Sequence, residues 1–233
     1  MQNYWIPGEE QWRDSHLESL HTLLNVTAAI HQLVADFATA PEIVKTDHTK
    51  QLSVERLLLR RLGEELRSVE LLAERGHGFQ AASAAATLFE QAHFLNYVSS
   101  DALAADAFIN WSDPHYSKKV KEVVTASGKA HGWDQDRTDD EYAKYRFLCG
   151  FKHNNPLFMK LLQLPVDPDQ YLGRLALADS DWFILITVGT LAMRRLVAAN
   201  VPPFIERCNQ LMDSVKAELD SLPKITTSAT SVA

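Results

Sequence analysis

Residues 81–98 read AASAAATLFEQAHFLNYV, and this stretch decides the fold class. Alanine lies on nearly every side of the helix that the stretch predicts, and the chain contains no run of alternating β-branched residues long enough for a sheet. Small side chains allow neighbouring helices to approach one another closely. We therefore expect a helix over about residues 79–98 at the centre of an all-α bundle.

The rest of the chain repeats its apolar residues with a period close to 3.6, which predicts further helices around this one. Pro41 is expected to close the first helix, Ser53 could cap the second, and Gly76 and Gly78 are expected to end it. A polar loop is predicted at 131–140. The expected architecture is one helical domain over 1–222, with about seven or eight helices, and a disordered tail at 223–233. Besides 79–98, the predicted helices span 10–38, about 53–75, one or two parts of 101–127, 157–164, 179–199 and 203–222.

Composition narrows the classes of partner. The formal net charge of −7 opposes non-specific binding to DNA or to an anionic membrane, so any contact with nucleic acid must be local. Two cysteines form no disulfide framework, and the N-terminal stretch lacks the features of a signal peptide, which favours a cytoplasmic location. The most apolar stretch, 182–193, has only 12 residues and is expected to be a buried core helix.

The stretch KYRFLCGFKHNNP at 144–156 carries the candidate site. Arg146 and His153 are seven positions apart, so on an unbroken helix they would share one face with Cα atoms about 10 Å apart, and one phosphate could lie between them. Gly150 lies in this interval, where it weakens a helix by about 1 kcal/mol relative to Ala. The predicted substrate-binding residues beside the pair are Lys152, Asn154 and Asn155.

This stretch resembles the signature of the HEPN superfamily of small helical bundles, an arginine and a hydrophobic residue followed within a few residues by a histidine. Here the signature residues are Arg146, Phe147 and His153, with six residues between Arg and His. The segments 65–98 and 145–156 are more specifically similar to an uncharacterised bacterial family of helical domains of unknown function. The resemblance covers about residues 55–200, the predicted HEPN-like core.

The resemblance implies a metal-independent endoribonuclease that acts as a homodimer, with two Arg/His pairs in one cleft. In this role His153 is the general acid/base, Arg146 binds the phosphate, and Glu90 is the acidic residue of an earlier helix. RNA is then the expected substrate, no metal or other cofactor is predicted, and a toxin or defence effector is the suggested biological role. Catalytically silent HEPN-like domains bind nucleotides or proteins, so a non-catalytic binding or oligomerisation module stays open.

Two further interpretations compete with this site. Arg146 could simply pair with a nearby carboxylate, Asp140 or Glu141, while His153 caps a helix end. A di-iron helical bundle is the other alternative, because residues three apart on a helix can ligate one metal ion. Its candidate ligands are the three Glu-x-x-His pairs Glu18/His21, Glu74/His77 and Glu90/His93.

Overall fold

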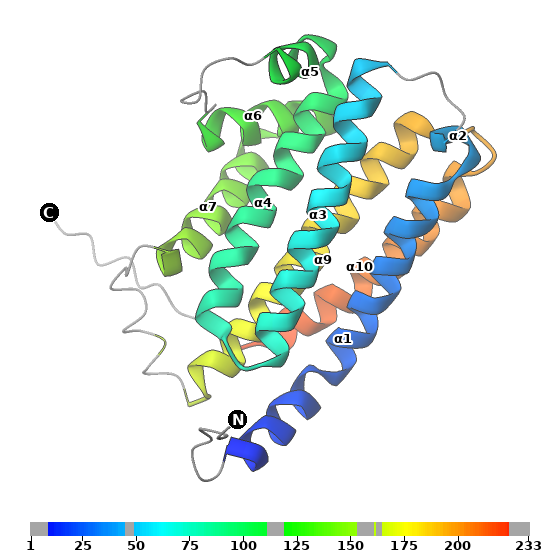
Figure 1. The fold of residues 1–233 in the computed structure, drawn as a ribbon. Coiled ribbons are helices and arrows are strands. Elements are labelled where there is room, and N and C mark those ends of the chain that lie inside the picture. Colours follow the sequence, from blue (N-terminus) through cyan, green and yellow to red (C-terminus); the bar gives the residue numbers. More distant parts are fainter. Residues whose placement is uncertain (1–8, 45–48, 111–118, 153–160, 162–164, 224–233) are drawn as a thin grey trace, which may run out of the picture.

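The computed structural model describes residues 9–44, 49–110, 119–152, 161 and 165–223, and within them it confirms the all-α class. Helices make up 89% of these described residues, and none of them forms a strand (Figure 1). The helices are α1 (Glu9–Thr39), α2 (Pro41–Val44), α3 (Lys50–Glu74), α4 (Gly78–Ser100), α5 (Ala102–Ile109), α6 (Val120–His131), α7 (Gln135–Lys152), α9 (Pro168–Arg195) and α10 (Val201–Ser221).

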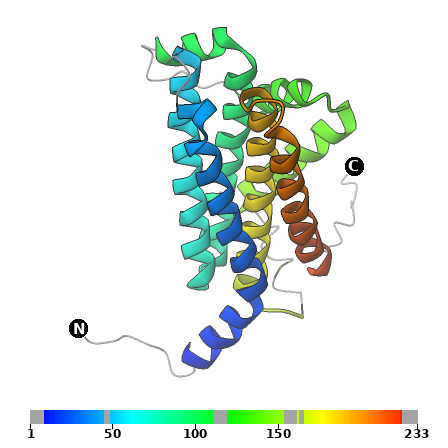
Figure 2. The same ribbon diagram turned by 90° about the vertical axis from the view of Figure 1, so that its right-hand side faces the viewer.

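Helices α4 and α9 form the centre of the bundle. Helix α4 packs against α3, α5, α6, α7 and α9, and α9 also packs against α1, α3 and α10. In Figures 1 and 2, α6 and α7 lie on one side of this centre, whereas α1 and α10 lie on the other. The alanine-rich stretch is therefore central, as predicted.

The small residues of α4 explain this close packing. Five of its alanines are almost fully buried, and a Cβ atom added at Gly78 would overlap the backbone carbonyl of Asp169 at the start of α9. Phe89 is fully buried in the same helix, with its ring centroid 4.7 Å from that of Phe183 on α9. The buried alanines are Ala81, Ala82, Ala85, Ala86 and Ala92.

Two predicted boundaries around α3 are wrong. The N-cap of α3 is Thr49, whose side chain accepts a hydrogen bond from the Leu52 amide, so Ser53 lies inside the helix. Gly76 follows the end of α3 in the left-handed conformation (φ 73°), as expected, but Gly78 is the first residue of α4. The connection between the two helices is consequently shorter than the sequence suggests.

The predicted polar loop at 131–140 is also wrong, because α7 begins at Gln135. Gly132 ends α6 in the left-handed conformation, and the Asp134 side chain then accepts a hydrogen bond from the Arg137 amide at 2.9 Å. Asp134 thus caps a helix whose first turns are polar, a pattern that resembles a loop when only composition is considered.

Helix α9 begins eleven residues before its predicted start at 179. Asp167 accepts a hydrogen bond from the Gln170 amide, and Pro168 occupies the first turn, where a missing amide hydrogen costs nothing. By length and composition α9 could cross a membrane, but 83% of its apolar window is buried inside the bundle, which is typical of a core helix. The predicted helix at 157–164, except Leu161, and the predicted tail after Pro223 lie outside the described residues.

Candidate functional site

Helix α7 carries the N-terminal part of the predicted site. It continues without interruption through Gly150 to Lys152, so the helix tolerates this glycine. Arg146 is exposed on α7. His153, Asn154 and Asn155 lie outside the described residues, as does the side chain of Lys152, so the predicted shared face of Arg146 and His153 stays a prediction.

The local pairing expected as an alternative for Arg146 is not observed. Glu141 is 4% exposed, and it pairs instead with Lys144, with 3.0 Å between Oε1 and Nζ. Asp140 is exposed, and no residue in the described part of the chain forms an ion pair with Arg146. The Arg146 guanidinium therefore remains accessible to an anion from outside.

Glu90 lies beside α7 next to Arg146. The Tyr145 hydroxyl donates a hydrogen bond of 2.8 Å to Glu90 Oε1, and the Tyr145 ring stacks on Phe89 with 5.3 Å between centroids. Burial raises the pKa of Tyr145, and hydrogen bonds with Cys149 and Glu90 raise it further. The tyrosine is thus neutral at physiological pH and holds the Glu90 carboxylate against α7.

Cations and aromatic rings alternate on the surface formed by α6 and α7. The Lys121 ammonium lies 5.7 Å from the ring centroid of Tyr142, which precedes Arg146 by one helical turn. Arg137 lies over the Trp133 ring at 4.7 Å. Stacking surfaces beside positive charges are features of proteins that bind single-stranded nucleic acids.

A buried polar cluster between α4, α7 and α9 was missed by sequence reasoning. His93 on α4, Glu141 on α7 and Asp179 on α9 are 4%, 4% and 7% exposed. Burial raises the pKa of Asp179 to about 7, with the nearby Lys144 opposing this change and Glu141 adding to it. A charged residue in an apolar helix such as α9 was the signal that could have indicated the cluster.

Two histidines of this region are neutral at physiological pH. Burial lowers the pKa of His93 to about 3, and positive charge at His131 and Lys144 contributes to the decrease. Burial also lowers the pKa of His131 to about 4, together with the positive charges of Arg194 and Arg137. His131 stacks on Trp133 with a centroid distance of 4.5 Å, and its Nδ1 lies 3.1 Å from the Thr190 hydroxyl. Neither imidazole is available as a base on the surface.

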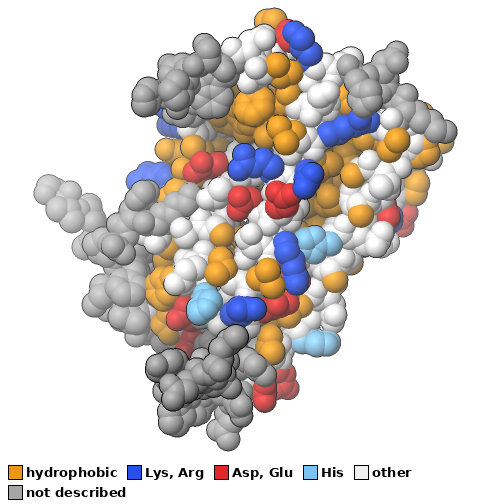
Figure 3. All heavy atoms as spheres, viewed as in Figure 1, with side chains coloured by type: hydrophobic (Ala, Val, Ile, Leu, Met, Phe, Trp, Pro, Cys, Tyr) orange, Lys and Arg blue, Asp and Glu red, His pale blue; other side chains and the backbone are white. Residues whose placement is uncertain are grey.

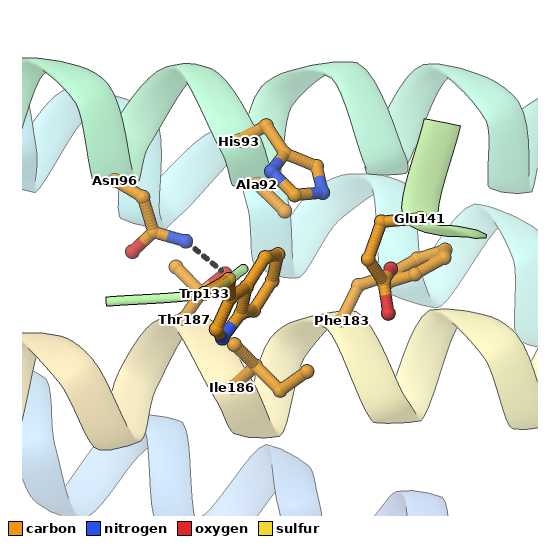
Figure 4. A pocket seen from close by; sticks show the side chains of 8 residues that line it. All are labelled: Ala92, His93, Asn96, Trp133, Glu141, Phe183, Ile186 and Thr187. Atoms are coloured by element: carbon orange, nitrogen blue, oxygen red, sulfur yellow. Dashed lines mark hydrogen bonds between the residues drawn. The ribbon is translucent and has the colours of Figure 1, made fainter. Parts of the chain in front are cut away.

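The cluster lines a small pocket that opens between the helices (Figure 4). The space available to the centre of a water-sized sphere is about 10 Å³, which corresponds to about one water molecule. Such a pocket excludes a nucleotide, so RNA would have to bind elsewhere. The lining residues are Ala92, His93, Asn96, Trp133, Glu141, Phe183, Ile186 and Thr187.

The described residues offer no support for the di-iron interpretation. Among them, no group of three or more His, Cys, Asp or Glu side chains could hold a metal ion. The residues of the Glu90/His93 pair also have different surroundings, because Glu90 accepts a hydrogen bond from Tyr145 whereas His93 packs against Phe89 and faces the pocket.

Comparisons with family models, curated proteins and solved structures found no match to this chain. The HEPN resemblance therefore rests on the motif at 146–153 and on its helical context.

Proposed function

We propose that this protein is an HEPN-like, metal-independent endoribonuclease that uses Arg146 and His153. The observation that carries the proposal is the state of Arg146, which is exposed on α7 and forms no ion pair with any residue in the described ranges. A guanidinium in this state can form bidentate hydrogen bonds with a phosphate. RNA cleavage also explains why the motif places a histidine two helical turns farther along the chain.

The proposed reaction is an internal phosphoryl transfer. Neutral His153 removes the proton of a ribose 2′-OH, the 2′ oxygen attacks the adjacent phosphorus, and the bond to the 5′ oxygen breaks. Arg146 stabilises the negative charge that develops on the phosphate oxygens. The products are a 2′,3′-cyclic phosphate and a 5′-hydroxyl group, and the latter requires a proton from a second acid.

A homodimer would supply that acid. In a two-fold dimer the same surface of each chain faces its copy, so His153 of the partner subunit could protonate the leaving oxygen. Lys121 and Tyr142 beside Arg146 support RNA as the substrate, because a base can stack on the ring while the ammonium contacts a phosphate. Glu90, held by Tyr145, is suited to orient Arg146 or the ribose.

RNA cleavage in EDTA tests the proposal. Purified wild-type protein is expected to cleave mixed RNA in the presence of the chelator, and His153→Ala and Arg146→Ala are each expected to lower the rate about 10²- to 10³-fold. Arg60→Ala is the matched control, because Arg60 is an equally exposed helical arginine that pairs only with Glu64 at 3.0 Å. Equal activity, or equal inactivity, of the wild-type and His153→Ala proteins would refute the enzymatic role.

A non-catalytic binding or oligomerisation module remains the second candidate, and exposed apolar side chains favour it. Leu57 on α3 and Leu103 and Ile109 on α5 are 51%, 77% and 44% exposed, and α3 and α5 pack against each other. Figure 3 shows hydrophobic side chains gathered at this end of the molecule. Light scattering at micromolar concentration separates the candidates in part, since a monomer of 26.2 kDa would remove the composite active site.

A further inference from the structure

Three polar atoms in the pocket between α4, α7 and α9 have no hydrogen-bond partner within the described protein. They are Nδ1 of His93, Oδ1 of Asn96 and Oε2 of Glu141, and their side chains are only 4%, 2% and 4% exposed. Buried polar groups are almost always paired, either with protein or with ordered water. Figure 4 shows the three side chains around one space, although they belong to two different helices.

The other polar atoms of two of these side chains are already occupied. The Asn96 amide nitrogen donates to the Thr187 hydroxyl at 3.2 Å, and Glu141 Oε1 accepts a hydrogen bond from Lys144 at 3.0 Å. Asn96 and Glu141 are thereby held in place with one acceptor oxygen each left over. The pocket is a rigid site that needs a hydrogen-bond donor.

The size and lining of the pocket restrict what can bind. Its volume of about 10 Å³ admits about one water molecule. The rest of the wall is apolar or aromatic, formed by Ala92, Trp133, Phe183 and Ile186. A larger polar ligand would leave its own groups unpaired against these side chains.

The donor and acceptor pattern matches that of water. Asn96 and Glu141 present two acceptors, so two hydrogens of the ligand can point at them. His93 is neutral because burial lowers its pKa to about 3, and in the tautomer protonated at Nδ1 it donates to the oxygen of the ligand. Water has two hydrogens and accepts as well, so one molecule satisfies all three groups.

We infer that this pocket binds one buried water molecule, which donates to Asn96 and Glu141 and accepts a hydrogen bond from His93. The water completes a polar layer that joins α4 to α7, the helix that carries Arg146. It also assigns the neutral tautomer of His93, with the proton on Nδ1. This site is independent of whether the protein cleaves RNA.

Crystallography and NMR test the inference on the full chain. In wild-type crystals we expect an ordered water within about 2.7–3.2 Å of at least two of the three named atoms. The ¹⁵N shifts of the His93 ring should show a neutral imidazole protonated at Nδ1. Direct protein–protein hydrogen bonds in place of the water, or a His93 ring protonated at Nε2, would overturn the inference.

A matched pair of variants sharpens the test, because Asn96 and Thr187 are bonded to each other. Asn96→Leu removes one acceptor of the water and should abolish or strongly weaken its density. Thr187→Val removes a neighbouring hydroxyl but no proposed ligand of the water, so the density should remain. A water that survives equally in both variants would exclude Asn96 as a ligand and contradict the proposed geometry. If either variant fails to fold, the wild-type density and the His93 tautomer decide.

Discussion

Replacing Asp179 with asparagine should change the pH dependence of stability by a large amount. Asp179 is 7% exposed on α9, and burial raises its pKa from 3.8 to about 7 in the folded protein. Between these values the folded state binds a proton that the unfolded state has released, so the free energy of unfolding falls as pH rises through this window. Since one pH unit corresponds to about 1.4 kcal/mol, the full interval corresponds to about 4 kcal/mol.

The expected result is a rising difference between the two proteins. At pH 4 Asp179 is protonated in the folded wild type, so Asp179→Asn should have little electrostatic advantage there. By pH 8 the variant should have gained about 4 kcal/mol relative to wild type, because asparagine never becomes charged. Lys144 and Glu141 face Asp179 from α7, and Tyr171 lies near it on α9, so their charges modify the midpoint but not the sign.

Urea denaturation of both proteins at half-unit steps from pH 4 to pH 8 measures this difference. His93 and His131 titrate in the opposite sense, since their lowered pKa values reduce stability as pH falls, but both are present in each protein and cancel in the difference. Asp213→Asn, at an exposed position on α10, should give no trend with pH. A difference between wild type and Asp179→Asn that changes by less than about 1 kcal/mol would refute the buried-acid reasoning.

Two other stability predictions follow from packing and charge. Arg195→Met should cost about 3–5 kcal/mol in denaturant unfolding, because Arg195 donates two hydrogen bonds to Glu55, which is 5% exposed and would be left as a buried, unpaired carboxylate; the double variant Arg195→Met/Glu55→Met should recover most of the loss, and a loss that persists would contradict the charge argument. Gly78→Ala should destabilise by about 1–3 kcal/mol because the new Cβ overlaps the Asp169 carbonyl, whereas Gly63→Ala in α3 has open space and should stabilise by about 0.5–1 kcal/mol, so thermal unfolding must shift in opposite directions.

Local features of the sequence determined the fold class. The alanine-rich stretch 81–98 and the 3.6-residue apolar period identified the helices and placed α4 at the centre, because helix formation and side-chain size act over a few neighbouring residues. Helix starts were less predictable. Asp134 and Asp167 cap α7 and α9 with single side-chain hydrogen bonds, and the same residue types are equally common in loops.

The sequence also singled out Arg146 and His153, but only the tertiary structure decided the state of the arginine. Glu141 is five residues before Arg146 and was a reasonable partner in sequence, yet α7 turns it inward toward Lys144 and the pocket. Arg146 is consequently exposed, which no local pattern could establish.

The buried polar layer depended entirely on the tertiary structure. His93, Glu141 and Asp179 are separated by about 40 residues or more along the chain, and each lies in a helix that looks ordinary by itself. Their proximity is set by how α4, α7 and α9 pack, and packing also removes the water that would otherwise keep their pKa values normal. Periodicity shows which face of a helix is buried, but the partner of a buried charge is chosen by the relative positions of helices distant in sequence.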